Sequence, residues 1–463
     1  MGRSDALVLY GFTGDLARKK IFPALYELER HGALSMPVIG VSGSRLDDGQ
    51  ARERVRASVE EERPAGDRAA LERLLSRVSY VGGDYREAAT FEALRRTLGA
   101  ARAPAHYLAV PPALFETVIA SLARTGLNQA ARLIVEKPFG RDLASARALD
   151  AAARAAFPEA SIFRIDHYLG KEAIMNLLYF RFANTFLQPV WCRDCIDSVQ
   201  LTMAESGGVG TRGGFYESVG ALRDVVENHL FQIVALLAME APRTRASDDV
   251  QAAKIAVFEA MRPLRPADLV RGQYAGYRQE KDVAPDSDVE TYCALRLHID
   301  TPRWRGTPWY LRAGKGLAAD AVEVHVRLRP PAHALFEDSA EAAAEPNALR
   351  LRLQPGEAIA LSARVKRPGK RFVGERRELL LCEDTRGDAL PYERLLGDAL
   401  AGDATLFTSG AAVEAAWAVV DPVLWTPPRV VPYQRGTWGP READALFVGA
   451  GGWVEPLAFG VGQ

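Results

Sequence analysis

The feature that most constrains this chain lies near its start, where a short apolar run meets a glycine turn and then a helical pattern. The run 6–10 reads as a buried strand, and Gly11 and Gly14 follow it before apolar residues recur at helical spacing. Gly11 permits a tight turn, and Gly14 lets the backbone approach a pyrophosphate at a helix N-terminus. Ala17 stands where a third small residue packs helix against strand. The stretch predicts the opening βαβ unit of a dinucleotide-binding domain, although an ordinary β-turn gives a similar glycine pattern.

The same alternation continues through the first third of the chain. Further short apolar segments, separated by charged or helical stretches, read as strands at 37–41, 79–81, 106–110, 132–135 and 161–163. Near-continuous apolar strands alternating with helices indicate a parallel sheet covered on both faces, an α/β Rossmann-like domain. Ligands of such sheets bind beyond the carboxyl ends of the strands. The residues expected to converge there are Thr13, Ser42, Pro111, Glu136-Lys137-Pro138 and Asp166-His167.

The residues after the second strand bear on the phosphate state of the dinucleotide. An acid at this position binds the ribose hydroxyls of NAD, whereas an arginine accepts the extra phosphate of NADP. Here the chain reads Ser42-Gly43-Ser44-Arg45, with no acid before Asp47. This loop therefore favours NADP and leaves NAD open.

A second stretch rich in reactive side chains, residues 164–172, follows the sixth predicted strand and reads Arg-Ile-Asp-His-Tyr-Leu-Gly-Lys-Glu. His167 and Lys171 are four residues apart, so they share one face if a helix begins here. Donors at a helix N-terminus suit a phosphate or carboxylate, because the free N–H groups and the helix dipole act together. The alternative is an ordinary surface helix start. The apolar face of the predicted helix comprises Ile174, Leu177, Leu178, Phe182 and Phe186.

Length and charge limit the classes of function. A chain of 463 residues is too long for one ordinary core and predicts two or three domains. The formal net charge of −1 gives no electrostatic case for nucleic acid or a membrane surface, so an anion must be bound by a local group of basic side chains. No apolar run approaches the roughly 20 residues that span a bilayer. We therefore expect a cytoplasmic protein.

The cysteines give a weaker signal. Cys192 and Cys195 form a C-x-x-C pair, with no second pair and no histidine close by in sequence. Such a pair can be a structural zinc site or a redox couple, but the absence of further ligands favours incidental packing.

Blocks spread over nearly the whole chain, in the same order, resemble the glucose-6-phosphate dehydrogenase family. The nine-residue block 164–172 is the most specific of them. The others are 11–20 (GFTGDLARKK), 136–140 (EKPFG), 223–229 (RDVVENH), 310–315 (YLRAGK), 391–395 (PYERL) and 436–440 (GTWGP).

The resemblance implies a fold and a reaction. It implies oxidation of β-D-glucose 6-phosphate at C1 to 6-phosphogluconolactone, the first oxidative step of the pentose phosphate pathway, with hydride passing to NADP and without a metal ion. It also implies an NAD(P)-binding domain, which we place at 1–166, and an α+β domain with a large, mostly antiparallel sheet at 167–463. That sheet is the expected contact of a homodimer or homotetramer.

The resemblance also assigns roles to particular residues. Removing a hydride from C1 requires a base for the hydroxyl proton, and histidine suits that task near neutral pH. By resemblance His229 is this base, and Asp166 is the carboxylate that orients it. His167, Tyr168 and Lys171 are assigned to the sugar phosphate. The remaining substrate contacts implied are Lys20, Lys137, Glu205, Asp224 and Lys315, and the cofactor contacts are Gly11, Thr13, Gly14, Asp15, Leu16, Ser42, Ser44, Arg45, Pro111 and Lys137. A cis peptide is expected between Lys137 and Pro138.

The chain departs from the family at two places. Many members carry, at the position of Gly43, an arginine that binds the 2′-phosphate of NADP; here Thr13, Ser42, Ser44 and Arg45 are the candidate substitutes, and use of NAD is a second hypothesis. A basic residue common in the family is missing from 319–321 (Ala-Asp-Ala). Two other functions remain as alternatives: a non-catalytic NADP-binding sensor, and a dehydrogenase of unphosphorylated glucose.

The rest of the chain fits the second domain. Residues 230–237 predict a buried helix directly after His229, and 291–299, 322–328 and 349–353 alternate apolar and polar residues as half-buried antiparallel strands do. His298 and His325 fall in these alternations, so we expect them to be sheet residues.

Overall fold

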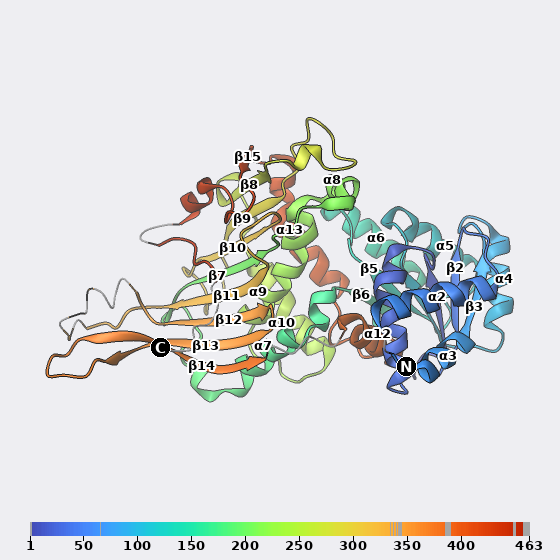
Figure 1. The fold of residues 1–463 in the computed structure, drawn as a ribbon, viewed down its shortest axis with the longest axis horizontal. Coiled ribbons are helices and arrows are strands. Elements are labelled where there is room, and N and C mark those ends of the chain that lie inside the picture. The colour runs from blue at the N-terminus through green and yellow to red at the C-terminus, as the bar shows by residue number, and fades with distance from the viewer. Residues whose placement is uncertain are drawn as a thin grey trace. The chain divides into compact units, whose positions relative to one another are not determined.

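The computed structural model describes residues 2–64, 66–333, 335–336, 338, 340, 345–384, 390–447 and 451–456. Two compact units make up the chain (Figure 1). Unit 1 comprises Met1–Glu172, Pro242–Ala252 and Ala389–Glu414, and unit 2 comprises Ala173–Ala241, Ala253–Asp388 and Ala415–Gln463. The domain boundary placed between 166 and 167 stays a prediction.

Unit 1 is built on a parallel sheet of six strands in the order β3-β2-β1-β4-β5-β6. Every neighbouring pair is parallel, which confirms the predicted α/β Rossmann-like class. The predicted strands are confirmed to within a few residues at each end. Their bounds are β1 (Ala6–Tyr10), β2 (Val38–Ser42), β3 (Val78–Gly82), β4 (Pro104–Leu108), β5 (Arg132–Glu136) and β6 (Ile162–Ile165).

Helices cover both faces of this sheet (Figure 1). Alternate residues of β1 enter two different cores: Leu7 and Leu9 pack with α1, α2, α3 and α12, whereas Val8 and Tyr10 pack with α4, α5 and α6. Both faces of the strand are therefore apolar, which explains its continuous hydrophobic sequence. The helix bounds are α1 (Phe22–Arg30), α2 (Asp48–Glu62), α3 (Arg68–Arg77), α4 (Ala88–Leu98), α5 (Phe115–Thr125), α6 (Leu143–Ala156) and α12 (Pro391–Ala401).

Unit 2 contains a nine-stranded sheet in the order β14-β13-β12-β11-β7-β10-β9-β8-β15. Its neighbouring strands are antiparallel except for β7 with β10 and β8 with β15, which confirms the predicted large, mostly antiparallel sheet. The bounds are β7 (Ile196–Ala204), β8 (Leu269–Tyr274), β9 (Tyr292–Leu297), β10 (Trp309–Gly314), β11 (Ala321–Leu328), β12 (Ala348–Gln354), β13 (Glu357–Lys366), β14 (Gly374–Asp384) and β15 (Val430–Tyr433).

The remaining helices lie between these strands or at their ends. Helix α9 is buried along its whole length, as predicted, and follows directly on the π-helical segment η7 that carries His229. His325 lies within β11, and His298 follows the end of β9 by one residue. The bounds are α7 (Glu172–Ala183), α8 (Gly213–Ala221), η7 (Leu222–Leu230), α9 (Phe231–Ala238), α10 (Ser247–Ala260) and α13 (Gly410–Trp425). None of the helices described is both long enough and apolar enough to cross a bilayer.

The helix predicted to begin at His167 begins later. Residues His167–Gly170 form a short 3₁₀ turn, η4, and Lys171 is extended (φ −75°, ψ 141°), so α7 starts at Glu172. The prediction that His167 and Lys171 share one helix face is therefore wrong. The predicted helix also ends early, because α7 stops at Ala183 and Phe186 lies beyond it, 55% exposed.

Candidate active site

The glycine turn after β1 has the geometry that a dinucleotide-binding loop requires. Gly11 has φ +80°, and a Cβ there would lie 2.1 Å from the carbonyl oxygen of Ala109, so no other residue fits without displacing the backbone. The amide of Gly14 donates to the carbonyl of Gly11 at 2.9 Å and closes the turn. The helical segment that follows includes the π turn η1 (Ala17–Ile21). Backbone N–H groups at the start of this segment suit a pyrophosphate.

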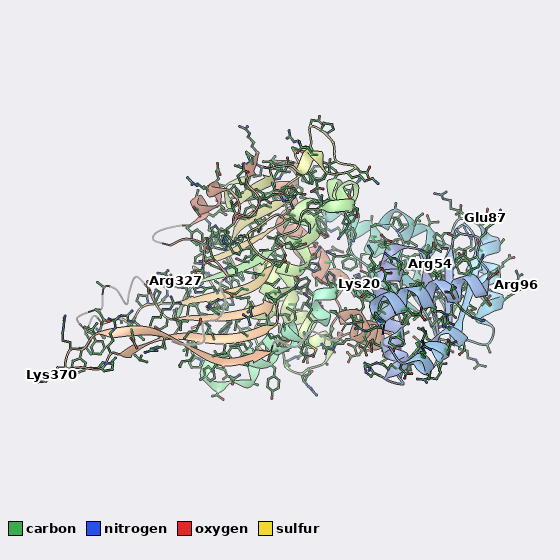
Figure 2. The ribbon with its side chains drawn as sticks, in the orientation of Figure 1. Lys20, Arg54, Glu87, Arg96, Arg327 and Lys370 are labelled. Atoms are coloured by element: carbon green, nitrogen blue, oxygen red, sulfur yellow. The ribbon has the colours of Figure 1, made fainter. Side chains whose placement is uncertain are left out.

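Other predicted cofactor and substrate residues of unit 1 differ in how exposed their side chains are. The Asp15 side chain is largely exposed and lies 3.8 Å from Lys19, whereas the partly buried Leu16 packs against the unit 1 core. Pro111 is exposed after β4 and precedes a short 3₁₀ turn. Lys20, predicted to reach the substrate, is exposed on η1 (Figure 2).

A cluster of hydroxyl groups links the glycine turn to the end of β2. Thr13 Oγ1 donates to Ser42 Oγ at 3.2 Å and accepts from Ser44 Oγ at 3.4 Å. The phenol of Tyr80, from β3, lies 2.6 Å from Ser42 Oγ and donates to the Ser44 carbonyl at 2.6 Å. The structure thus brings three predicted cofactor residues, Thr13, Ser42 and Ser44, together with Tyr80, which the sequence analysis did not single out.

The acids that follow β2 in sequence are hydrogen-bonded to backbone amides. The two nearest acids along the chain are already engaged, because Asp47 caps α2 through the Gln50 amide and Asp48 accepts from the Tyr80 amide, at 2.8 and 2.7 Å. Neither acid has the position that would hold ribose hydroxyls directly at the end of β2. Arg45 is exposed, and a Cβ placed on Gly43 would meet no heavy atom within 4 Å.

Three predicted phosphate ligands come together just after β6 in unit 1. The rings of His167 and Tyr168 lie 5.3 Å apart, and Lys171 Nζ lies 4.1 Å from the centre of the Tyr168 ring. The Asp166 carboxylate, 2% exposed, accepts from the Tyr168 amide at 3.0 Å. That amide is one of the N–H groups expected to bind an anion at a helix start, and here it is bound to Asp166 instead.

Behind these residues lies a buried polar cluster that the sequence did not reveal. Glu136, the last residue of β5, accepts a 2.5 Å hydrogen bond from Tyr107 and another from Tyr392 on α12. Burial raises the pKa of Glu136 to about 7, while the two phenols act in the opposite direction. Tyr392 also stacks on His167, with ring centres 6.2 Å apart and planes 10° from parallel.

The cluster supports the chain segment on which Lys137 lies. The peptide between Lys137 and Pro138 is cis, as expected, directly after Glu136. Lys137 is half-buried, and its positive charge lowers the pKa of the neighbouring Glu136 carboxyl, though less than burial raises it. A strongly apolar strand ending in Glu was the one available sequence signal for this buried carboxyl.

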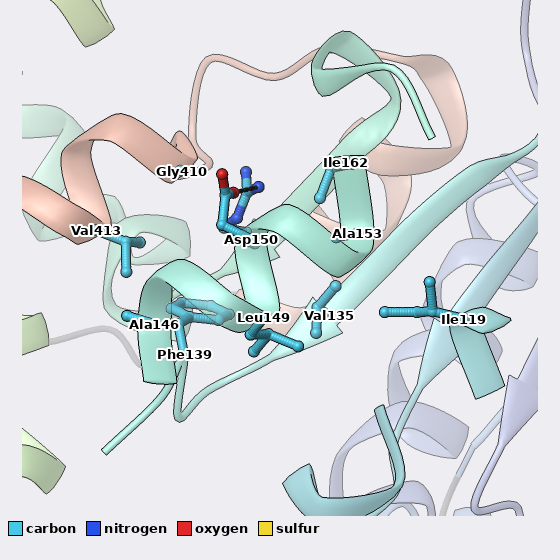
Figure 3. Close-up of a pocket in the computed structure, with 11 residues that line it drawn as sticks. Ile119, Val135, Phe139, Ala146, Leu149, Asp150, Ala153, Ile162, Gly410 and Val413 are labelled. Atoms are coloured by element: carbon cyan, nitrogen blue, oxygen red, sulfur yellow. Dashed lines mark hydrogen bonds and ion pairs between the residues drawn. The ribbon is translucent and has the colours of Figure 1, made fainter. Parts of the chain in front are cut away.

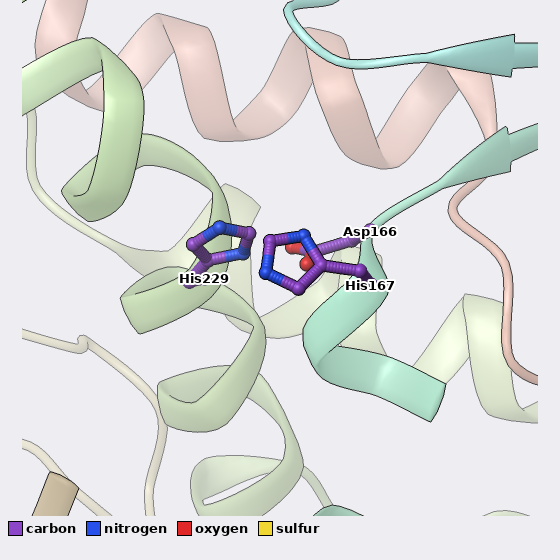
Figure 4. Close-up of side chains that lie close together, drawn as sticks. All are labelled: Asp166, His167 and His229. Atoms are coloured by element: carbon purple, nitrogen blue, oxygen red, sulfur yellow. The ribbon is translucent and has the colours of Figure 1, made fainter. Parts of the chain in front are cut away.

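The predicted base lies in unit 2, on the π-helical segment η7. His229 is 3% exposed, and its backbone amide donates to the side chain of Asn228 at 2.6 Å. The Asn228 amide group in turn donates to the Arg223 carbonyl at 2.9 Å. Together with the fully buried α9, these contacts fix the backbone that carries the imidazole. Figure 4 shows the side chain of His229 on η7, and those of Asp166 and His167 at the end of β6.

A second group of predicted substrate residues lies at the end of two neighbouring strands of unit 2. Lys315 Nζ lies 2.6 Å from Glu205 Oε2, and 5.5 Å from the ring centre of Tyr216. Tyr216 is buried, and burial raises its pKa, with the carboxylates of Asp224, Glu290 and Glu205 adding to the effect. The structure therefore groups Glu205, Asp224 and Lys315 around Tyr216, a residue that the sequence analysis did not single out.

Unit 1 also contains a small cavity, shown in Figure 3. It is lined mainly by apolar side chains, among them Leu149 of α6 and Phe139 of the loop after β5, together with the ion-paired Asp150 and Arg164. None of the predicted site residues lines it, and its lining offers no cationic group that is free of a carboxylate partner. It is a packing feature of the helical layer.

These features define the class of protein. A doubly wound parallel sheet with a glycine turn after its first strand makes unit 1 a dinucleotide-binding domain of the Rossmann type. The second unit, with a large mixed sheet, adds a buried histidine and a lysine–carboxylate pair.

Comparison with known proteins identifies the family. The model described as "Glucose-6-phosphate dehydrogenase, NAD binding domain" matches residues 8–176, and the model of the C-terminal domain of the same enzyme matches 178–454. The chain is 44% identical over 458 residues to "Glucose-6-phosphate 1-dehydrogenase 1" of Mycobacterium bovis, covering 98% of this chain and 97% of that protein. It belongs to the glucose-6-phosphate dehydrogenase family.

Solved structures of the same family have the same fold as this chain. A crystal structure of glucose-6-phosphate 1-dehydrogenase from Mycobacterium avium is 42% identical, with a TM-score of 0.93 over 99% of this chain and 100% of that one. A glucose-6-phosphate dehydrogenase in complex with its substrate is 33% identical, with a TM-score of 0.89 over 97% and 100% of the two chains.

Proposed function

We propose that this protein oxidises β-D-glucose 6-phosphate at C1 to 6-phosphogluconolactone and passes the hydride to a nicotinamide dinucleotide, the first oxidative step of the pentose phosphate pathway. The observation that carries the proposal is the match to glucose-6-phosphate dehydrogenases across both units. The two domain models together span residues 8–454, with one residue between them. The chain also carries each residue type that the reaction needs.

The base of the proposed mechanism is His229, and Asp166 orients it. When bound, the nicotinamide accepts the hydride from C1. The C1 hydroxyl must lose its proton as the carbonyl forms, and an imidazole is well matched to that transfer near neutral pH. A carboxylate that accepts from one ring nitrogen leaves the other nitrogen free to take the proton. The fixed backbone around His229 supports this role because a base must be held in one direction.

The sugar phosphate is bound by His167, Tyr168 and Lys171. A phosphate dianion pairs best with cationic and hydroxyl donors through charge-assisted hydrogen bonds. The grouping of these three side chains after β6 supports the assignment. The sugar hydroxyls and C1 are then contacted by the remaining predicted substrate residues, which are Lys20, Lys137, Glu205, Asp224 and Lys315.

NADP is the preferred cofactor in this proposal, with NAD as the alternative. The glycine turn and the hydroxyls of Thr13, Ser42 and Ser44 fit a dinucleotide, and the acids that follow β2 are engaged elsewhere. NAD use stays open because Gly43 offers no side chain to the 2′-phosphate. We propose no metal in the reaction, since a base and a hydride acceptor account for both hydrogens removed.

We also propose a homodimer or homotetramer built on the sheet of unit 2, and a cytoplasmic location. Edge strand β14 exposes Leu379, Leu380 and Leu381, each about half accessible at 51%, 46% and 52%. Three consecutive exposed leucines on a sheet edge favour a protein partner over water. All four cysteines are free thiols, which suits a reducing compartment.

The direct test is an assay of the purified protein with glucose 6-phosphate and either NADP or NAD, following the absorbance of the reduced nicotinamide. We expect reduction with glucose 6-phosphate and, at equal concentration, little with unphosphorylated glucose, because glucose lacks the group that His167, Tyr168 and Lys171 bind. Equal rates with glucose would favour the sugar dehydrogenase alternative. Cofactor binding without reduction of either nucleotide would favour the non-catalytic sensor.

A further inference from the structure

An arginine in the middle of α2 points its guanidinium at the glycine turn. Arg54 Nη2 donates to the carbonyl oxygen of Thr13 at 2.5 Å. Its Nε is buried and has no hydrogen-bond partner within the described part of the chain. No carboxylate of the described residues forms an ion pair with it, so its positive charge is not neutralised locally. Figure 2 labels Arg54 on this helix.

Its neighbours on the same helix have other partners. Arg56 is held by Glu72 at 2.7 Å and Glu53 at 3.4 Å, and Arg52 donates from Nε to the Val78 carbonyl at 3.0 Å. Arg45, in the loop after β2, is exposed and would lose more side-chain freedom on binding a ligand than the half-buried Arg54. Arg54 is therefore the arginine best prepared to act at the hydroxyl cluster.

The charge of Arg54 reaches that cluster. Burial raises the pKa of Tyr80, and the hydrogen bond with Ser42 and the positive charge of Arg54 oppose that rise. Tyr80 and Thr13 both contact Ser42, at 2.6 and 3.2 Å. One guanidinium and several hydroxyls thus surround the end of β2, next to Gly43. This combination of donors suits a phosphate monoester.

We propose that Arg54, together with the hydroxyls of Thr13, Ser42 and Ser44, binds the 2′-phosphate of NADP and sets the preference for NADP over NAD. The inference rests on the proposed function. A guanidinium has five N–H donors, and the bond to Thr13 occupies one of them, so donors remain for a phosphate. Arg54 thereby supplies the cation for the 2′-phosphate, which Gly43 in the loop cannot supply because it has no side chain.

The test measures binding without catalysis. The affinities of 2′,5′-ADP and 5′-ADP are determined by isothermal titration calorimetry for the wild-type protein and for Arg54→Met, Arg54→Lys and Arg56→Met. Removing a charge-assisted contact to phosphate should weaken 2′,5′-ADP binding about tenfold or more in Arg54→Met. Binding of 5′-ADP should stay within about twofold, which also shows that the glycine turn is intact. Arg54→Lys should restore part of the preference, and the matched control Arg56→Met should leave both affinities unchanged.

Each outcome decides a different point. If the wild-type protein prefers 2′,5′-ADP and Arg54→Met keeps that preference, the role of Arg54 is wrong while the proposed function stands. If the wild-type protein binds the two nucleotides equally, the 2′-phosphate site is wrong and a dehydrogenase that uses NAD remains. Binding of neither nucleotide would overturn the inference and the proposed function together.

Discussion

Lys315 and Glu205 are separated by 110 positions in the sequence, yet Lys315 Nζ lies 2.6 Å from Glu205 Oε2. The parallel pairing of β7 and β10 explains the contact, because Ala204 and Gly314 are register partners and the charged residues follow them directly. The Glu205 amide also donates to the Gly314 carbonyl at 2.9 Å. The Lys315 side chain is mostly buried and that of Glu205 is half exposed, so the pair faces solvent on its carboxylate side.

Replacing Lys315 should weaken substrate binding more than turnover. Lys315→Met removes a cation assigned to the sugar and leaves Glu205 unpaired. We expect KM for glucose 6-phosphate to rise about tenfold or more, with a smaller change in kcat. Steady-state kinetics with saturating NADP measures both constants. Lys281→Met, which replaces an exposed lysine of the same unit, is the control and should change neither. An unaltered KM in Lys315→Met would remove this residue from the site.

Replacing His229 tests the base. His229→Asn keeps a polar side chain but removes a group that takes a proton near neutral pH, so kcat should fall by about 10²–10⁴-fold. Binding of glucose 6-phosphate, measured by calorimetry, should change little. His298→Asn, which alters a half-buried histidine beside β9, should retain wild-type kcat. Substantial turnover in His229→Asn would place the base elsewhere.

The buried carboxyl of Glu136 should make stability depend on pH. Its pKa is about 7 in the folded protein and about 4.3 in the unfolded chain, so between these values the folded protein binds more protons. Stability should therefore fall as pH rises through this window and level off above about pH 7, by an amount on the order of 3 kcal/mol from this group.

Glu136→Gln should reduce the loss of stability between pH 5 and pH 8. Urea unfolding of both proteins at the two pH values measures the difference. Glu53→Gln, at a largely exposed position of α2, should keep the wild-type pH dependence. The same slope in Glu136→Gln and wild type would mean that Glu136 is ionised throughout.

The ion pairs of Arg164 should be structural. This side chain is 6% exposed and pairs with Asp150 and with Glu159, the latter at 2.8 Å. Arg164→Met removes the closest cation of the largely buried Asp150 carboxylate, and breaking a buried pair in this way typically costs about 3–5 kcal/mol of unfolding free energy. Arg154→Met removes a more exposed arginine 3.7 Å from the same Asp150 and should cost far less. Chemical denaturation compares the variants, and equal losses in both would contradict the structural role of Arg164.

Much of unit 1 could be predicted because its signals are local. Strand β1 is buried on both faces and is an uninterrupted apolar run, and the other strands of this sheet contain enough apolar residues to stand out from the charged helices between them. The turn at Gly11 carries its own signature, since φ +80° and the close Ala109 carbonyl require glycine. The second domain was predicted from the family resemblance, because the matching blocks continue in the same order as far as residues 436–440.

The remaining features depend on long-range packing. The contact between Lys315 and Glu205 requires β7 and β10 to be neighbours, which alternation alone does not specify. Tyr392 reaches Glu136 because α12 joins unit 1 from late in the chain. Helix spacing after His167 was misleading because Asp166 caps a 3₁₀ turn there, so the helix begins five residues later. Arg54 lies in a charged helix whose sequence does not distinguish it from Arg52 or Arg56.

The central claim is that the hydride leaves C1 of glucose 6-phosphate. Glucose 6-phosphate deuterated at C1 provides the most direct test, with mass spectrometry of the reduced nicotinamide formed by the purified protein. The mechanism predicts one deuterium on each reduced nicotinamide and 6-phosphogluconolactone, or the acid formed by its hydrolysis, as the product. Reduced nicotinamide without deuterium, or no reduction at all, would contradict it.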